Sequence, residues 1–250
     1  MIKIDDLWDE VIRFIYDRNA YARELTDFLE QKGVRKENMI IDACAGSGFP
    51  SLELLTEGYK VIPLDGTGRM VELFNQNAKQ RGLDTRSALM KWEELPHQYT
   101  GKARAILCRG NSLIYAGSSW GIDELDIEKA QSAVQQTLRN FYECLEDGGI
   151  LYVDKFSKDE IAKETRKGAI HVAGNSEQLL WRVEHDLKER TRRWTLIREQ
   201  SGGQRIEYPN KGYFLMYEEL RAILYNVGFR KVEEVQLTSE KNYTVMIAYK

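Results

Sequence analysis

The stretch that decides the fold is Ile40-Ile41-Asp42-Ala43-Cys44-Ala45-Gly46-Ser47-Gly48-Phe49-Pro50-Ser51-Leu52. Two apolar residues lead into an acidic one, two glycines follow one position apart, and leucines at helical spacing come after a proline. This order predicts a strand, a tight turn and a helix. The glycines let the backbone turn sharply and approach a ligand closely, and a proline suits a first helical turn. The open N-terminus of such a helix favours electron-rich ligand groups.

The glycine spacing separates this turn from two other nucleotide-binding loops. A dinucleotide fingerprint has the form G-x-G-x-x-G, and Ser51 occupies the place of its third glycine. A phosphate-binding G-x-x-x-x-G-K-[ST] sequence does not occur near any expected strand. An acidic strand end followed by this turn instead resembles motif I of the class I S-adenosylmethionine-dependent methyltransferases. The alternative is a glycine-rich turn in some other α/β fold.

Length and composition fit one large domain, because the chain has 250 residues and ordinary apolar content. No apolar run is long enough for a membrane span, and the acidic first residues argue against a signal peptide. Three cysteines without C-x-x-C spacing favour reduced thiols and a cytoplasmic protein. The net charge of −3 gives no reason to expect a nucleic-acid partner, and the histidines lack the spacing of a metal site.

After two N-terminal helices, strands and helices alternate along the chain. We expect strands at 38–43, 60–64, 85–90, 103–108 and 150–155, with helices at 49–57, 67–81 and 126–146. This order predicts an α/β, doubly wound (Rossmann-like) sheet of seven mostly parallel strands with helices on both faces. Ligands in such a sheet bind beyond the carboxyl ends of the strands.

Residues 169–216 differ in character, because apolar and polar residues alternate there and the segments are separated by charges and by Gly202-Gly203. This pattern predicts a small antiparallel strand insert. We therefore expect one methyltransferase domain over residues 1–250. Its parts are an N-terminal helical cap (1–34), a nucleotide-binding core (35–168), a strand insert over the acceptor site (169–216), and a C-terminal helix and strand pair (217–250).

Two further features point to a nucleoside. Asp65 ends the second expected strand, where an α/β nucleotide fold places the carboxylate that binds the ribose hydroxyls. The alternative is that Asp65 caps the next helix, although Thr67 can serve as that cap. After the following strand comes Met90-Lys91-Trp92, whose indole would lie over an adenine. Here the alternative is a tryptophan packed in the core.

A more specific resemblance is to the glycine/sarcosine N-methyltransferases, carried in matching order by Asp42–Gly48, Asp65 with Met70, Met90–Leu95, Ile106–Ser112 and Gly148–Asp154. Gly110-Asn111-Ser112 is the most telling part, because most class I methyltransferases have nothing like it. The resemblance covers residues 35–160 and implies S-adenosyl-L-methionine as cofactor, with S-adenosyl-L-homocysteine as its product. The cofactor-binding residues that it implies are Asp42, Cys44, Gly46, Gly48, Asp65, Met70, Lys91, Trp92 and Arg109.

Within that set, the resemblance implies that Cys44 and Gly46 lie against the methionine part and that Met70 and Trp92 flank the adenine. Arg109 is expected to contribute backbone contacts. An arginine from the N-terminal helices holds the cofactor's carboxylate in that family. Arg18 is our candidate for this role, and Arg23 is the alternative.

The acceptor side needs little chemical machinery. Transfer by direct SN2 displacement requires a neutral lone pair held in line with the methyl group in a dry pocket, so neither a catalytic triad nor a metal is needed. The resemblance implies that Asn111 faces the acceptor. Tyr115, Tyr208 and Tyr213 are expected to line the pocket, where hydroxyls orient an amine and rings exclude water. Ordinary packing is the alternative for these tyrosines.

The sequence departs from the resembled family at one place. There the fifth strand runs into Asp-His-Arg-Asn, and the arginine clamps an amino-acid carboxylate. Here the run is Asp154-Lys155-Phe156-Ser157, so Phe156 stands in the arginine's place. Lys155 or Lys158 could substitute for the arginine, but strand alternation points Lys155 to the side opposite Phe156.

We therefore expect a small-molecule acceptor that is not a simple α-amino acid, such as an aromatic or heterocyclic amine stacked on Phe156. The alternatives are a methyltransferase acting on RNA or protein, which would be expected to show a basic face, and a nucleotide-binding module without catalysis.

Overall fold

The computed structural model describes residues 4–118, 124–156, 162–172, 175–200 and 202–250. The chain divides into two compact units. The first, which we call the insert unit, consists of Met1–Tyr16, Ile114–Ala133 and Lys158–Leu215. The second, the core unit, consists of Asp17–Leu113, Val134–Ser157 and Met216–Lys250.

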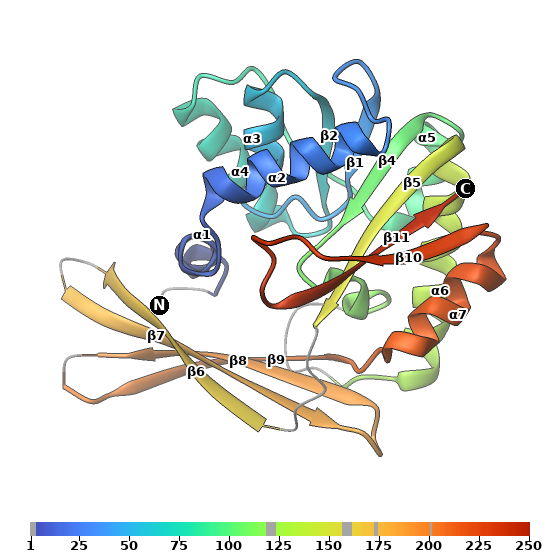
Figure 1. Ribbon diagram of the computed structural model, residues 1–250. Coiled ribbons are helices and arrows are strands. Elements are labelled where there is room, and N and C mark those ends of the chain that lie inside the picture. The colour runs from blue at the N-terminus through green and yellow to red at the C-terminus, as the bar shows by residue number, and fades with distance from the viewer. Residues whose placement is uncertain (1–3, 119–123, 157–161, 173–174, 201) are drawn as a thin grey trace. The chain divides into compact units, whose positions relative to one another are not determined.

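The core unit contains a seven-stranded sheet with strand order β10-β11-β5-β4-β1-β2-β3 (Figure 1). The strands from β3 to β5 in this order pair in parallel, whereas β11 and β10 are antiparallel additions at one edge. This confirms the expected doubly wound, mostly parallel sheet. Its strands are β1 (Met39–Asp42), β2 (Lys60–Asp65), β3 (Ala88–Leu89), β4 (Ala103–Cys108), β5 (Leu145–Phe156), β10 (Lys231–Val235) and β11 (Tyr243–Tyr249).

Helices lie on both sides of this sheet, with α2, α3 and α4 on one side and α6 and α7 on the other (Figure 1). Phe28 of α2 packs edge-on against Tyr152 of β5, with ring centroids 6.5 Å apart. Leu52 of α3 and Phe74 of α4 are fully buried in one apolar cluster. The helices are α2 (Arg18–Gln31), α3 (Ser51–Thr56), α4 (Gly68–Gln80), α5 (Leu95–Tyr99), α6 (Ile127–Cys144), α7 (Tyr217–Val227) and the short 3₁₀ turns η1 (Trp92–Glu94) and η2 (Ser112–Tyr115).

The insert unit holds helix α1 (Ile4–Ile15) and an antiparallel sheet of four strands in the order β6-β7-β8-β9. Trp8 of α1 meets Trp194 of β8 edge to face, with centroids 5.7 Å apart. The strands are β6 (Ala162–Val172), β7 (Asn175–Asp186), β8 (Thr191–Glu199) and β9 (Arg205–Tyr213). The strand insert was expected from residue 169, but β6 already begins at Ala162. Because β6 is an edge strand with a charged sequence, it lacks the alternating apolar pattern that identifies a strand.

Two other boundaries differ from the expected ones. The strand expected at 85–90 is only Ala88–Leu89, an exposed edge that pairs with the end of β2. The helix expected to reach 146 ends at Cys144, and β5 starts directly after it. The register of β5 against β4 shifts between Leu145 and Ile150, a segment that contains Gly149. A Cβ atom on Gly149 would lie 2.9 Å from the carbonyl oxygen of Glu146. Glycine makes this close approach possible.

Candidate functional site

The loop between β1 and α3 is tied to the buried carboxylate of Asp42. Oδ2 of Asp42 accepts a hydrogen bond from Oγ of Ser51 at 2.7 Å, and Oδ1 accepts the N–H of Cys44 at 3.3 Å. Ser51 is the first residue of α3. Its hydroxyl, at the place of the third glycine of a dinucleotide fingerprint, therefore donates a hydrogen bond to the Asp42 carboxylate. Pro50 stands one position earlier, as the N-cap of α3. Burial raises the pKa of Asp42 to about 6.

Asp65, the last residue of β2, reaches the same loop. Its Oδ2 accepts the N–H of Gly46 at 2.9 Å, and its Oδ1 accepts the N–H of Thr67 at 2.8 Å. Gly46 has φ 52 and Gly48 has φ 123, conformations that favour glycine. The contact with Thr67 agrees with the alternative that Asp65 organises the start of α4. A carboxylate at the end of β2 is chemically suited to accept ribose hydroxyls, and that role for Asp65 stays a prediction.

Trp92 is fixed by polar and ring contacts. Its Nε1 donates to the carbonyl oxygen of Ala43 at 2.6 Å, and its ring meets Phe141 of α6 edge to face at 5.8 Å. These contacts agree with the packing alternative for Trp92, and its place beside an adenine stays a prediction. Met70 is buried in the first turn of α4, whereas Lys91 is exposed and its N–H donates to Oε2 of Glu94 at 2.8 Å.

Arg109, directly after β4, is buried and contacts two aromatic rings. Its Nε donates to the hydroxyl of Tyr21 at 2.8 Å, and its Cζ lies 4.4 Å from the Tyr21 ring centroid and 5.5 Å from that of Phe49. Its backbone N–H donates to Sγ of Cys44 at 3.0 Å, and its carbonyl accepts from the same thiol at 3.4 Å. Cys44 therefore joins the first loop to the end of β4. The hydroxyls of Tyr21 and Tyr152 lie 3.0 Å apart, and burial raises the pKa of Tyr21.

Asp154 of β5 binds the turn that carries Asn111. Its Oδ1 accepts the N–H of Asn111 at 2.6 Å, and its Oδ2 accepts the N–H of Gly110 at 3.0 Å. Burial raises the pKa of Asp154 to about 7, with Glu240 adding to the rise and Arg109 opposing it. Asp154 lies in one of the segments that resemble the glycine/sarcosine N-methyltransferases, but no role in the site was predicted for it from the sequence.

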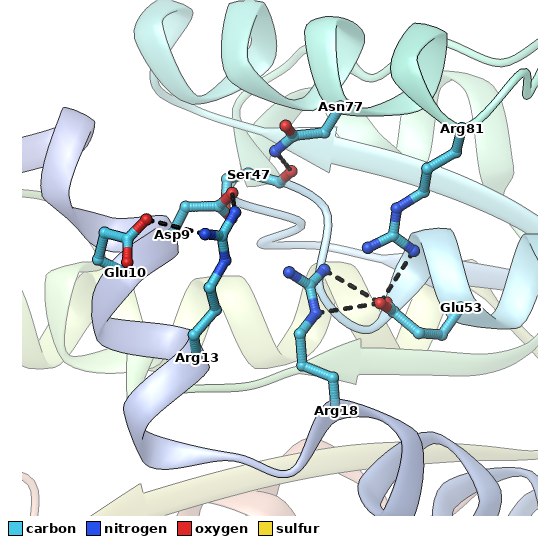
Figure 2. A network of polar contacts seen from close by, with 8 residues as sticks. All are labelled: Asp9, Glu10, Arg13, Arg18, Ser47, Glu53, Asn77 and Arg81. Carbon is cyan, nitrogen blue, oxygen red and sulfur yellow. Dashed lines mark hydrogen bonds and ion pairs between the residues drawn. The ribbon is translucent and has the colours of Figure 1, made fainter. Parts of the chain in front are cut away.

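Arg18 lies beside the glycine loop, with its Cζ 5.2 Å from the ring centroid of Phe49. Its side chain forms an ion pair with Glu53 of α3 (Figure 2). Arg23, the alternative candidate, is exposed on α2. Sequence reasoning overlooked Phe49 and Tyr21, although Phe49 lies inside the deciding stretch and Tyr21 follows Arg18 by one helical turn.

Phe156 ends β5 and is partly exposed. Its ring meets Tyr243 of β11 edge to face, with centroids 6.3 Å apart. The neighbouring Lys155 is buried, and its Nζ donates to the carbonyl oxygen of Phe156 at 3.0 Å. Lys158 lies outside the described residues.

The three tyrosines of the predicted acceptor pocket belong to the insert unit. Tyr115 is hydrogen-bonded to Arg192, and burial raises the pKa of Tyr115. The hydroxyl of Tyr208 accepts from Nη1 of Arg198 at 3.2 Å. Tyr213 is fully buried, and its hydroxyl accepts from Nη2 of Arg190 at 2.7 Å. Full burial agrees with the packing alternative for Tyr213, while pocket roles for Tyr115 and Tyr208 stay predictions.

Two features are absent from the residues that the structure describes. No group of three or more histidine, cysteine, aspartate or glutamate side chains in those ranges could hold a metal ion. No helix in the same ranges is both long and apolar enough to cross a membrane.

A sheet of this order, with acidic residues ending β1 and β2 beside a glycine loop, has the class I methyltransferase fold. A solved structure with this fold is that of the CcbJ methyltransferase from Streptomyces caelestis, with a TM-score of 0.71, 15% identity, and coverage of 98% of this chain and 95% of that one. The model of the methyltransferase domain family matches residues 35–209. The chain therefore belongs to the methyltransferase domain family, whose class I members use S-adenosylmethionine.

Two curated relatives are N-methyltransferases. A glycine/sarcosine N-methyltransferase from Halorhodospira halochloris is 31% identical over 157 residues, covering 62% of this chain and 53% of the relative. A glycine/sarcosine/dimethylglycine N-methyltransferase from Actinopolyspora halophila is 27% identical over 237 residues, covering 91% of this chain and 37% of the relative. The chain thus spans about half the length of the first relative and less of the second. The resemblance to this group of N-methyltransferases is confirmed.

Proposed function

We propose that this protein transfers the methyl group of S-adenosylmethionine to an amine nitrogen of a small molecule that lacks a free α-carboxylate. Nitrogen as the acceptor atom is supported by the relatives, which are N-methyltransferases at 27–31% identity. The restriction on the carboxylate rests on Phe156, which stands where the relatives' family has an arginine.

The chain's own residues fit an adenosyl cofactor. Asp65 is a buried carboxylate beside the glycine loop, and its oxygens are suited to the ribose hydroxyls. Arg18 would hold the carboxylate of the methionine part, while Met70 and Trp92 would flank the adenine. The bound cofactor supplies a methyl group that is already activated by its sulfonium.

The remaining task is to orient a neutral amine. The carboxamide oxygen of Asn111 would accept one amine N–H and thereby direct the lone pair toward the methyl carbon. Asn111 has only to hold the amine in line, because bound S-adenosylmethionine would supply the methyl carbon and would retain the electron pair of the S–C bond that is broken. The methylated ammonium then loses a proton to water. No residue has to be activated as a nucleophile.

The acceptor restriction follows from the charge balance at the end of β5. Transferring a carboxylate into a site without a paired cation costs several kcal/mol, which is enough to lower turnover by orders of magnitude. Lys155 is buried and already donates to a backbone carbonyl, so it is a poor replacement for a planar arginine fork. The partly exposed ring of Phe156 suits a flat or weakly anionic molecule.

The test compares amines that differ by a carboxylate alone. We expect kcat/KM for tyramine to exceed that for tyrosine, and kcat/KM for glycinamide to exceed that for glycine. Phe156→Arg should raise kcat/KM for glycine, whereas Phe156→Leu, the matched control, should not. Efficient glycine or sarcosine methylation by the wild-type protein would contradict the restriction. Label from the cofactor appearing in bulk RNA or protein would contradict a small-molecule acceptor.

A further inference from the structure

One edge of the Arg18 guanidinium is occupied by Glu53 (Figure 2). Oε1 of Glu53 accepts Nε–H of Arg18 at 3.1 Å and lies 3.0 Å from Nη2 of the same guanidinium. The Arg18 and Glu53 side chains are only 18% and 11% exposed, so solvent screens this pair less than an exposed one. Glu53 lies in the first turn of α3, immediately after the glycine loop.

Glu53 is itself held from α4 by a second arginine. Nη1 of Arg81, the C-cap residue of α4, lies 2.9 Å from the same Oε1. One turn earlier, Nδ2 of Asn77 donates to the carbonyl oxygen of Ser47 at 2.8 Å, which ties α4 to the glycine loop (Figure 2). Oε2 of Glu53 is buried and has no hydrogen-bond partner among the residues that the structure describes. Donors from two guanidiniums therefore converge on one oxygen.

The ring of Phe49 restrains the guanidinium of Arg18 from another side. The Arg18 Cζ lies 5.2 Å from the ring centroid, within the range of a cation–π contact. A guanidinium has two edges that can each bind a carboxylate with a pair of N–H groups. Glu53 occupies the Nε–Nη2 edge, so the Nη1–Nη2 edge is left for a second anion. Within the described part of the chain, Nη1 has no hydrogen-bond partner.

We propose that Glu53 is a positioning residue that presents the Nη1–Nη2 edge of Arg18 to the α-carboxylate of the cofactor's methionine part. This inference rests on the proposed role of Arg18 in binding the cofactor. Two arginines and one glutamate leave a net positive charge in the cluster, so an anion is still attracted after the internal pair has formed. Fixing a long side chain before binding reduces the ordering cost that binding must otherwise offset.

The experiment uses two ligands that share a nucleoside and a thioether. S-adenosylhomocysteine carries the amino-acid part, whereas 5′-methylthioadenosine does not. By calorimetry, Glu53→Gln should weaken S-adenosylhomocysteine binding about five- to tenfold, the cost of ordering one flexible side chain. Binding of 5′-methylthioadenosine should change less than about twofold, because that ligand has no carboxylate. A general loss of structure would weaken both ligands equally.

Two further variants make the result decisive. Glu57→Gln removes the same charge from an exposed position at the end of α3 and should leave both affinities unchanged. Arg18→Gln should weaken S-adenosylhomocysteine at least as strongly as Glu53→Gln does. Combining the two changes should add nothing, because Glu53 acts only through Arg18.

The possible failures are distinguishable. If Arg18→Gln leaves S-adenosylhomocysteine affinity unchanged, the proposed cofactor role of Arg18 is wrong. If Arg18→Gln weakens binding but Glu53→Gln leaves it unchanged or tightens it, Glu53 does not position Arg18, and a tighter complex would mean that it competes with the ligand. If Glu53→Gln does not fold, Glu53→Asp keeps the charge but withdraws the carboxylate from Arg18 by one methylene, and it should weaken the two ligands in the same unequal way.

Discussion

Asn111 donates its backbone N–H to Oδ1 of Asp154 at 2.6 Å while adopting φ 58, a left-handed conformation that few non-glycine residues occupy. The preceding Gly110 is also left-handed, with φ 68, and donates to the other oxygen of the same carboxylate. Two successive N–H groups thus point at one buried carboxyl group. The carboxylate at the end of β5 thereby stabilises the turn that carries the predicted acceptor-binding amide.

We predict that Asp154→Asn lowers the free energy of unfolding by about 1–3 kcal/mol at pH 5, where the buried carboxyl is protonated. Both of its oxygens can still accept an N–H, whereas an amide nitrogen cannot and would leave one N–H unpaired. The acceptor KM should rise more than the dissociation constant for S-adenosylhomocysteine. Urea unfolding and ligand titration measure the two effects. Asp147→Asn, an exposed change in the same strand, is the control and should alter neither. Equal stability of Asp154→Asn and wild type would contradict the role of this carboxylate.

Stability should fall as the pH rises from about 4 to about 7. Asp42 and Asp154 have folded pKa values of about 6 and about 7, both raised by burial above the ordinary aspartate value of roughly 3.9. Between these values the native state binds more protons than the unfolded state, so each pH increase favours unfolding. Asp154 alone should account for a loss on the order of 2 kcal/mol between pH 5 and pH 8. Urea unfolding across this pH range should show that the free energy of unfolding of Asp154→Asn depends less steeply on pH than that of the wild type. An unchanged slope would show that groups other than Asp154 cause the pH dependence.

The deciding stretch and Asp65 could be predicted because their signals are local. A strand, a glycine turn and a helix follow one another within a dozen or so residues, and an acid at a strand end is visible in the sequence. The Arg109–Tyr21 contact was not predictable in this way, because its partners are 88 positions apart and meet only in the folded sheet. From the sequence we therefore expected only backbone contacts from Arg109 and did not predict that its guanidinium is buried against the rings of Tyr21 and Phe49.

Two other features could not be predicted, because their residues have the charged sequences that are typical of exposed segments. Glu53 has the sequence appearance of a solvated helix residue, and its burial depends on arginines that begin α2 and follow α4. The charged sequence of β6 concealed an edge strand, so the insert starts earlier than alternation indicated. Asn111 was assigned to the acceptor through the family resemblance, whereas Tyr115, Tyr208 and Tyr213 were chosen because hydroxyls can orient an amine and rings can exclude water.

Asp65→Ala should weaken S-adenosylhomocysteine binding by roughly 2 kcal/mol or more, because the ribose hydroxyls would lose their acceptor. The same change frees the N–H groups of Gly46 and Thr67, so thermal unfolding must be measured beside calorimetry. Asp65→Asn keeps one carbonyl oxygen and should fall between wild type and alanine. Binding of NADH that is tighter than that of S-adenosylmethionine by the wild-type protein would contradict a methyltransferase nucleoside site.

Two substitutions distinguish the effect of the backbone conformation of Asn111 from the effect of its side-chain carboxamide. Asn111→Gly accommodates φ 58 without a steric cost, whereas Asn111→Ala adds strain of about 1 kcal/mol. Alanine should therefore be the less stable variant. If the carboxamide orients the acceptor, both variants should lose turnover of the best amine from the substrate panel, since both lack it, and cofactor affinity should stay within about threefold. If Asn111→Gly keeps wild-type turnover, only the geometry of the turn matters. If the variants keep their turnover but bind the cofactor much more weakly, Asn111 serves the cofactor and not the acceptor.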